Sequence, residues 1–493
     1  MCGFIGIINP KLKNDIVLNK LHDSQKILIN RGNDSSNIFR NKKYNSYLAF
    51  NRLSIVDLDK RSNQPMKYSH NDKTIIGMLN GEIYNYQDLK HKLEAKKYKF
   101  NTSSDTEVLL ALILDQGFSS LRKLEGIFSI FIFDEEKGKM YLIRDQIGVK
   151  PLYYTNYDSE LNFIFASEIK ALINLKESKP NKDKLIEFAC FGEISDEKTI
   201  FDGIHQLLPG EIIEIDLTNN YKLKKTNYFN LSSLYNHISN KTTSTNELFH
   251  NLKESITSVI NLQTISEVPI GIQLSGGLDS SLLAAIACAD NNLNSYSTIF
   301  KNFHLSEEYW QDLVAENLSI KNKKINASDE LFNEESISKL IYKNDGPIPH
   351  PNYVPCFLMC ERAQKDGIKV LLSGDGADEF FSGYKWFKPT IINNSSLDII
   401  NNSAFNSPED IKKLFGIKEI DFSFRESYLK DAIDKEAPNY QTKLSHLYMQ
   451  RFYLQKWLHR QDRTGMSHLI EIRVPYCDLK LIGNYINLRY NTL

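Results

Sequence analysis

The stretch Leu274-Ser275-Gly276-Gly277-Leu278-Asp279-Ser280-Ser281 decides the fold of the second half of this chain. The apolar run 268–273 before it predicts a buried strand, and the run of good helix formers at 282–287 predicts a helix. A Gly-rich loop between a strand and a helix places backbone N–H groups and a helix N-terminus around an anion. Asp279 adds a carboxylate that suits Mg²⁺ on a bound phosphate. The stretch therefore predicts a phosphate-binding loop.

This loop is not a Walker A loop, because no Lys follows its glycines. Its Ser-Gly-Gly-x-Asp-Ser pattern resembles the pyrophosphate loop of enzymes that split ATP to AMP and pyrophosphate. Those enzymes activate a carboxyl or carbonyl group as an adenylate. A Gly-rich turn without a ligand is the alternative that these eight residues alone leave open.

Strand and helix patterns alternate around this loop. Strands are predicted at 296–300, 324–326 and 368–372, and helices at 247–264, 307–318, 330–342 and 354–364. Such βαβ alternation predicts a parallel sheet covered by helices, with ligands bound at the carboxyl ends of the strands.

A second loop, Ser373-Gly374-Asp375-Gly376-Ala377-Asp378-Glu379, follows the predicted strand 368–372. Three acids in five residues at the end of a buried strand are costly unless they bind a partner, and a cation is the natural one. We therefore expect Asp378 to share Mg²⁺ with Asp279. A calcium-like loop and a simple helix cap remain open as alternatives.

The N-terminus carries a second candidate site. Removal of Met1 would give Cys2 a free α-amine with a pKa of roughly 8, which can act as general base for the thiol of the same residue. Residues 4–8 predict a buried strand directly after it. The alternative is that Cys2 is an incidental small residue.

Polar motifs follow in a fixed order. Arg52 is predicted to start a strand, Asn80-Gly81-Glu82 to form a tight turn, and residues 103–107 to cap a helix. The full set of motifs comprises residues 31–36, 52–57, 80–85, 103–107, 144–154 and 165–170.

These motifs resemble the class II glutamine amidotransferase domain over about the first 210 residues. The resemblance implies an αββα N-terminal-nucleophile hydrolase sandwich and hydrolysis of glutamine through a thioester on Cys2. It assigns Arg52 to the glutamine α-carboxylate, Glu82 and Asp105 to its ammonium group, and Asn80 with the Gly81 N–H to the oxyanion hole. Further glutamine-binding positions by this motif are Leu53, Ser54, Ile55 and Val56. The chain departs from the family at Asn33, where Pro is usual, and at Phe50, where His is usual.

The whole chain resembles the glutamine-hydrolysing asparagine synthetase family. The resemblance implies that aspartate and ATP form β-aspartyl-AMP, which ammonia from the Cys2 site attacks after travelling inside the protein. By motif, residues 275–281 hold pyrophosphate, Asp279 and Asp378 bind Mg²⁺, and Asp375 lies near the reacting acyl group. The nucleotide-lining positions are Leu274, Ser275, Gly276, Gly277, Leu278, Asp279, Ser280, Ser281, Thr298, Ser373 and Gly374.

The expected organisation is an amidotransferase domain at 1–215, a closing strand and linker at 216–245, and an ATP-pyrophosphatase domain of the adenine nucleotide alpha hydrolase type at 246–493. Residues 393–443 match the family poorly and predict a helical insertion. The family carries a Lys well downstream of the Glu-x-Arg-Val-Pro segment, but here the sequence ends 18 residues after Pro475 (493 − 475) and has no Lys after Lys480. We therefore expect glutamine hydrolysis with slow or absent pyrophosphate release; a shortened sequence and a true loss both remain open.

Composition narrows the partners. The chain has 493 residues, a net charge of −1, 41% hydrophobic and 25% charged residues, so no global field favours nucleic acid or a membrane surface. No apolar stretch approaches 18 residues. The six scattered cysteines predict a reducing cytoplasm, and Cys356 and Cys360 are predicted to pack rather than bind metal.

Three functions remain open. The first is an asparagine synthetase-like ligase that uses glutamine, aspartate, ATP and Mg²⁺. The second applies the same chemistry to another carboxylate, such as a sugar acid or a modified amino acid. The third is a non-catalytic or regulatory homologue. A homodimer is one option for its assembly.

Overall fold

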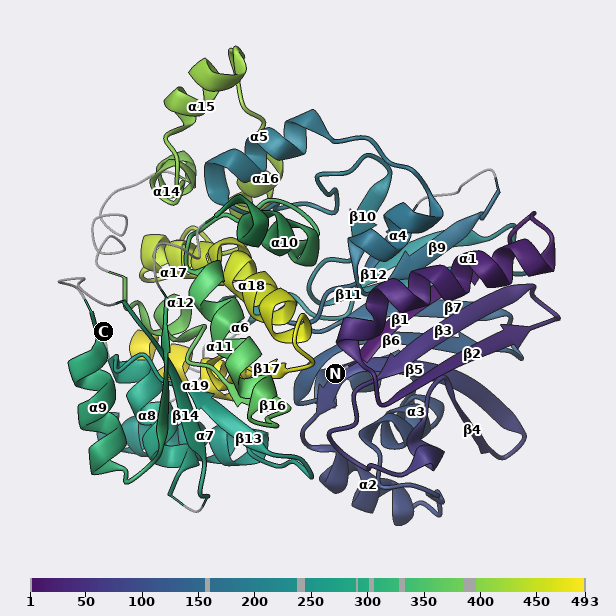
Figure 1. Ribbon diagram of the computed structural model, residues 1–493, viewed down its shortest axis with the longest axis horizontal. Helices are drawn as coiled ribbons and strands as arrows, with labels where there is room; N and C mark the ends of the chain where they lie inside the picture. The colour runs from purple at the N-terminus through teal and green to yellow at the C-terminus, as the bar shows by residue number, and fades with distance from the viewer. Residues whose placement is uncertain are drawn as a thin grey trace.

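The computed structural model describes residues 2–155, 160–236, 244–289, 291–300, 306–327, 333–384 and 396–491. In Figure 1 the N-terminal sheets, in purple and blue, lie on the right, and the green and yellow C-terminal half lies on the left. No helix in these described ranges is both long and apolar enough to span a membrane.

The N-terminal half contains two six-stranded sheets whose paired strands all run antiparallel. The first has the order β10-β8-β9-β1-β3-β2, with β1 Cys2–Ile8, β2 Ser35–Asn41, β3 Ser46–Arg52, β8 Tyr153–Thr155, β9 Phe163–Ala166 and β10 Ile204–Gln206. The second has the order β12-β11-β7-β6-β5-β4, with β4 Met66–His70, β5 Lys73–Ile83, β6 Gly126–Asp134, β7 Lys139–Arg144, β11 Glu211–Asp216 and β12 Lys222–Asn227.

The two sheets pack face to face over an aromatic core. Phe131 of one sheet stacks on Phe165 of the other, with ring centroids 5.0 Å apart, and Phe4 meets Phe165 edge-on at 6.1 Å. Helices α1 (Asn14–Ile27) and α4 (Ile169–Leu175) cover the first sheet, while α2 (Tyr86–Glu94) and α3 (Asp105–Gln116) lie against the second (Figure 1). The predicted αββα sandwich is confirmed.

Three local predictions were wrong. Arg52 ends β3 instead of starting a strand, and Asn80-Gly81-Glu82 lies inside β5 instead of in a turn. Part of the predicted linker forms β12, which pairs with β11 from Lys222 to Asn227. Its lysines are exposed because β12 is an edge strand, where charged side chains prevent pairing with another chain. These lysines also remove the alternation of apolar and polar residues by which a strand is recognised in a sequence.

Gly81 is a glycine whose backbone conformation and close neighbour on β6 both disfavour a side chain. Its φ is +140°, and a Cβ at this position would lie 1.9 Å from the carbonyl oxygen of Ile127 on β6. We expect Gly81→Ala to lower the free energy of unfolding by about 3 kcal/mol, because the backbone strain and the clash act together. The measurement is a denaturant titration with Gly117→Ala as control, since a Cβ at Gly117 (φ +67°) meets nothing within 4 Å. Equal losses in the two variants would contradict the steric argument.

The C-terminal half is built on a five-stranded sheet of order β15-β14-β13-β16-β17, in which every neighbouring pair is parallel. The predicted parallel sheet is confirmed, and the sequence analysis missed only its three-residue edge strand β17. The strands are β13 Ile270–Gln273, β14 Asn294–Ile299, β15 Asn322–Asn326, β16 Val370–Leu372 and β17 Glu471–Arg473.

Helices cover both faces of this sheet. The buried side chains of α7 (Thr245–Gln263) and α8 (Leu278–Ala287) form one apolar cluster with β13 and β16, and those of α11 (Tyr353–Lys365) form another with Tyr296 and Leu371. Other helices of the C-terminal half are α9 Glu308–Asn317, α10 Glu334–Asn344, α12 Ala377–Phe381, α18 Leu454–Met466 and α19 Leu479–Asn491.

The predicted insertion is helical in its described part. It contains α14 Ser396–Asn402, α15 Pro408–Phe415, α16 Ser423–Lys430 and the start of α17 Tyr440–Tyr448. Arg425 of α16 is buried and pairs with Glu187 at 3.1 Å and Glu193 at 2.6 Å, next to α5 (Lys182–Phe191). The insertion thus packs against the N-terminal half, as Figure 1 shows at the top.

Candidate active sites

A small cavity of about 20 Å³ lies at the start of β1. It brings together most of the residues predicted to bind glutamine: Cys2, Arg52, Leu53, Ile55, Val56, Gly81, Glu82 and Asp105. Ser54 and Asn80 are outside the lining; the Ser54 N–H donates to Asp34 Oδ2 at 2.7 Å. Sequence reasoning missed Ser62, Gln64, Leu79, Ser104 and Thr106.

Cys2 is held through its backbone. Its N–H donates to Asn80 Oδ1 at 3.1 Å, and its carbonyl accepts from Arg31 Nε at 3.1 Å. Burial raises the pKa of the Cys2 thiol, so formation of a thiolate depends on an adjacent base. Asn80 Nδ2 donates one of its two hydrogens to Ser129 Oγ at 3.1 Å, which leaves the second hydrogen for the predicted oxyanion role.

Arg52 is fixed by the loop that follows β3. Its guanidinium donates to the carbonyl oxygens of Asp59 (2.8 Å) and Asp57, and to Asn63 Oδ1 (3.1 Å). Arg52 is only 5% exposed. The side chain is therefore held beside the cavity, where a substrate carboxylate can meet it.

Glu82 and Asp105 place two carboxyl groups in the same buried space. Burial, with Glu471 and Asp105 nearby, raises the pKa of Glu82 well above its ordinary value. Burial also raises the pKa of Asp105 to about 6, although the Ile83 N–H donates to its Oδ2 at 3.0 Å. Ser104 caps α3 by accepting from the Thr106 N–H, which confirms the predicted cap and positions Asp105 in the first turn.

This titration predicts a pH dependence of glutamine binding. Below a pH of about 6, Asp105 is neutral and cannot pair with the glutamine ammonium group, so KM for glutamine should rise as pH falls through this value. A carboxyl group with an ordinary pKa near 4 would keep KM constant down to that lower pH. Steady-state kinetics from pH 5 to 8 test this. Asp105→Asn is the control and should show a higher KM without the inflection near pH 6; a parent KM that is flat across this range would contradict the assignment.

A larger cavity, of about 580 Å³, lies at the carboxyl ends of β13, β14 and β16. It brings together the predicted residues Leu274, Ser275, Gly277, Asp279, Ser280, Thr298, Ser373, Gly374, Asp375 and Asp378. Gly276, Leu278 and Ser281 do not line it. Sequence reasoning missed Gln273, Phe300, Glu307, Gln311, His350, Asn352, Cys356, Arg460 and Gln461, among others.

The loop before α8 has the geometry of an anion site. Gly277 is the N-cap of α8 and provides no side chain to cap it, so the first N–H groups of the helix are available to a ligand. Gly276 has φ +86°, and a Cβ there would lie 2.8 Å from the backbone nitrogen of Gln311. Ser275 and Ser280 hydroxyls are 2.9 Å apart and stabilise the loop.

Asp279 and Asp378 form an electrostatic pair in this cavity. Burial raises the pKa of Asp279, and the Asp378 carboxylate raises it further. Within the described ranges, neither has a cationic side chain as an ion-pair partner, and no three His, Cys, Asp or Glu residues gather as a metal cage. Two carboxylates without such a cage suit Mg²⁺ that takes its other ligands from phosphates and water.

The other acids of the second loop have protein partners. Asp375 Oδ2 pairs with Arg460 Nη2 at 2.6 Å and accepts from Gln461 Nε2 at 2.5 Å. Glu379 accepts from the Tyr384 hydroxyl at 2.7 Å, and burial raises its pKa to about 7. Of the three acids in this loop, Asp378, which the sequence assigned to Mg²⁺, is the one whose carboxylate these contacts leave for a cation.

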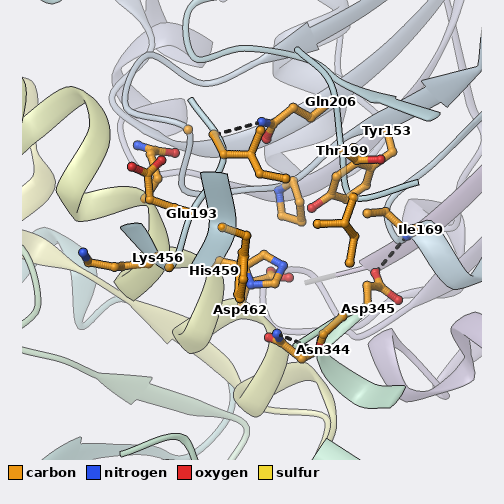
Figure 2. A pocket seen from close by; sticks show the side chains of 18 of the residues that line it. Tyr153, Ile169, Glu193, Thr199, Gln206, Asn344, Asp345, Lys456, His459 and Asp462 are labelled. Carbon is orange, nitrogen blue, oxygen red and sulfur yellow. Dashed lines mark hydrogen bonds between the residues drawn. The ribbon is translucent and has the colours of Figure 1, made fainter. Parts of the chain in front are cut away.

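A third cavity, of about 110 Å³, lies between the two halves (Figure 2). Its wall includes Asn344, Asp345, His459 and Asp462, and none of the predicted site residues. Lys456 also lines it; burial lowers the pKa of Lys456 to about 7, and its Nζ donates to the Phe191 carbonyl at 3.1 Å. This cavity is separate from both candidate active sites.

Comparisons with known proteins agree with this division. Residues 1–229 match the family model of the glutamine amidotransferase domain, and residues 251–492 match that of asparagine synthase. The fold and sites thus define a two-domain protein that joins an N-terminal-nucleophile amidotransferase domain to a parallel α/β nucleotide-binding domain.

Relatives identify the family. Asparagine synthetase [glutamine-hydrolyzing] 1 of Bacillus subtilis is 32% identical over 393 residues, which cover 79% of this chain and 60% of that protein. The putative asparagine synthetase [glutamine-hydrolyzing] 2 of Methanocaldococcus jannaschii is 30% identical over 420 residues, 81% of this chain and 78% of that protein. The chain belongs to the glutamine-hydrolysing asparagine synthetase family.

The matched regions do not span every relative fully. The chain covers 60% and 66% of the lengths of two Bacillus subtilis relatives. Among solved structures, glutamine phosphoribosylpyrophosphate amidotransferase from B. subtilis matches with a TM-score of 0.35 and 15% identity over 89% of this chain and 95% of that one, a similarity too low to carry an argument.

Proposed function

We propose that this protein is a glutamine-dependent asparagine synthetase. It would convert ATP, aspartate and glutamine to asparagine, glutamate, AMP and pyrophosphate through β-aspartyl-AMP. The observation that carries the proposal is the presence in one chain of two separate cavities, one with Cys2, Arg52 and Asp105, the other with the Ser275 loop and Asp279.

In the first cavity, the α-amine of processed Cys2 takes the thiol proton, and the sulfur attacks the glutamine carboxamide. Arg52 and Asp105 hold the two ends of the substrate's amino-acid group. The Gly81 N–H stabilises the tetrahedral oxyanion, assisted by the second Nδ2 hydrogen of Asn80. Ammonia leaves, and water then hydrolyses the thioester to release glutamate.

In the second cavity, the N–H groups of the Ser275 loop and of the first turn of α8 bind the phosphates of ATP. Mg²⁺, when bound by Asp279 and Asp378, would neutralise phosphate charge as pyrophosphate leaves. Asp375, held by Arg460 and Gln461, lines the same cavity, and we assign it a place near the acyl group.

The proposed domain division keeps 1–215 as the amidotransferase domain, 216–245 as the closing strand and linker, and 246–493 as the synthetase domain. The position of β12 extends the first structural unit through Asn227. The proposed partners are small molecules: glutamine, ATP and a carboxylate acceptor.

The test is pyrophosphate release from ATP by the purified protein with glutamine and a panel of carboxylates. Release with aspartate, together with asparagine formation, supports the proposal. Release with a different carboxylate, such as a sugar acid, would show that this carboxylate and not aspartate is the acceptor, while the proposed reaction type would stand. Glutamine hydrolysis with slow or absent pyrophosphate release for every acceptor is the outcome that the sequence analysis expects; it would contradict the ligase assignment for this chain and leave the glutaminase alone.

A further inference from the structure

The buried guanidinium of Arg31 connects the glutaminase site to the other half of the protein. Arg31 lies in the turn Leu28–Arg31 after α1 and is 0% exposed. Its Nε donates to the Cys2 carbonyl at 3.1 Å, and its Nη2 donates to Asn80 Oδ1 at 3.4 Å. The same Oδ1 accepts the Cys2 N–H, so Arg31 holds the nucleophile residue from two sides.

The rest of this guanidinium is held by carboxylates. Asp462 of α18 accepts two parallel hydrogen bonds, Nη1 to Oδ2 at 2.8 Å and Nη2 to Oδ1 at 2.9 Å, and Glu168 accepts from Nη1 at 2.9 Å. A guanidinium has five N–H donors in a fixed plane, and here five hydrogen bonds use all of them. Asp462 supplies two of the five, which sets the plane of the group.

The pair belongs to a neutral buried cluster. Three cations, Arg31, Lys170 and Arg463, meet three carboxylates, Glu168, Asp345 and Asp462. Burial alone would raise the pKa of Asp462, but Arg31 lowers it to about 2, so Asp462 is ionised at neutral pH. Figure 2 shows Asp462 and Asp345 on neighbouring walls of the cavity between the halves.

Helix α18 also carries residues of the second active site. Gln461, next to Asp462, donates to Asp375 and to Ser373 Oγ (3.0 Å), and Arg460 pairs with Asp375. Adjacent residues of one rigid element therefore hold Asp375 in one site and, through Arg31, Cys2 in the other.

We propose that Asp462 is a positioning residue of the glutaminase reaction, so that the C-terminal half completes the glutaminase site by holding Arg31 against Cys2 and Asn80. The inference rests on the proposed glutaminase function. Asp462 touches neither glutamine nor the thiol, and Arg31 does not line the glutamine cavity. A fault in this contact should therefore change the rate of the chemical step and not substrate affinity.

The experiment compares Asp462→Asn with Asp345→Asn in the full chain. Asp345 belongs to the same cluster and pairs with Arg463 at 2.9 Å and Lys170 at 3.1 Å, but no hydrogen bond joins it to Arg31 among the described contacts. The two variants remove the same charge from the same cluster, so they should be destabilised alike. We expect Asp462→Asn to lower kcat for glutamine hydrolysis about tenfold or more, with KM within about twofold, because small displacements of a nucleophile carry rate costs of this order. Asp345→Asn should retain the parent kcat.

A second readout follows Cys2 directly. The pH midpoint for alkylation of Cys2 by iodoacetamide should move to lower pH in Asp462→Asn, because Arg31 then adds a less neutralised positive charge to the N-terminus, Arg52 and Glu82, which already act on the thiol. It should stay at the parent value in Asp345→Asn. A purely structural role for Asp462 would move neither kcat nor this midpoint relative to the Asp345 control.

Three outcomes overturn the inference: parent kcat in Asp462→Asn, equal losses of kcat in both variants, or an unchanged alkylation midpoint in both. If Asp462→Asn does not fold, Asp462→Glu decides instead, because it keeps the charge and moves the carboxylate by one methylene; a parent kcat in that variant also overturns the inference. If the parent hydrolyses no glutamine, the proposed function fails, and the alkylation midpoints still test the contact.

Discussion

Replacement of Cys2 by Ala should reduce glutamate release from glutamine by about four orders of magnitude or more, because loss of a nucleophile removes the covalent route entirely. Cys2 lines the same cavity as Arg52 and Asp105. Its thiol has a raised pKa from burial, so it has little reactivity without an adjacent base. The measurement is glutamate formation by the purified variant.

The control for this prediction is Cys190→Ala, a buried cysteine of α5 that lies outside the glutamine cavity and should retain parent activity. A second arm keeps an extra residue before Cys2. This change converts the α-amine into an amide that cannot accept the thiol proton, so activity should fall nearly as far. Glutamine hydrolysis at the parent rate in Cys2→Ala would remove the amidotransferase assignment.

The second large effect is expected at Asp279 and Asp378. Either change to Asn should weaken binding of Mg·ATP about tenfold or more, because a neutral amide is a much poorer Mg²⁺ ligand than a carboxylate. When a chelator removes Mg²⁺, the affinity for ATP should not fall. Each substitution then removes a carboxylate that repels the phosphates, so metal-free ATP should bind to the variants no more weakly than to the parent.

Isothermal titration with and without Mg²⁺ separates these effects. The matched control is Asp312→Asn on α9, since Asp312 pairs with Lys324 at the protein surface and does not line the nucleotide cavity. If Asp279→Asn and Asp378→Asn bind Mg·ATP as the parent does, the proposed metal site is wrong.

Much of the fold could be predicted because its signals are local. The Gly-rich loop before α8, the cap at Ser104 and the alternation of strands and helices after residue 246 depend on residues close together in the chain. The wrong predictions arose where a contact distant in sequence overrode a local pattern. Asn80-Gly81-Glu82 has the composition of a turn, yet pairing with Ser129, Phe128 and Ile127 of β6 keeps it extended.

The candidate sites, too, were partly determined by the sequence and partly decided by the tertiary structure. The sequence by itself determined the residue types that carry the chemistry: a cysteine at position 2, a Ser-Gly-Gly loop without Lys, and acids after β16. Only the tertiary structure decided which acids remain for a cation, because Arg460 takes Asp375 and the Tyr384 hydroxyl binds Glu379.

The contact between Arg31 and Asp462 shows most clearly what the sequence could not predict. The two residues are 431 positions apart, and neither the motif around Arg31 nor the one around Asp462 predicts the other. Burial decides their pairing, since an arginine removed from water needs carboxylates wherever the folded chain places them. The sequence determined both sites as separate motifs, and the packing of α18 against the turn at Arg31 decided that they share one rigid connection.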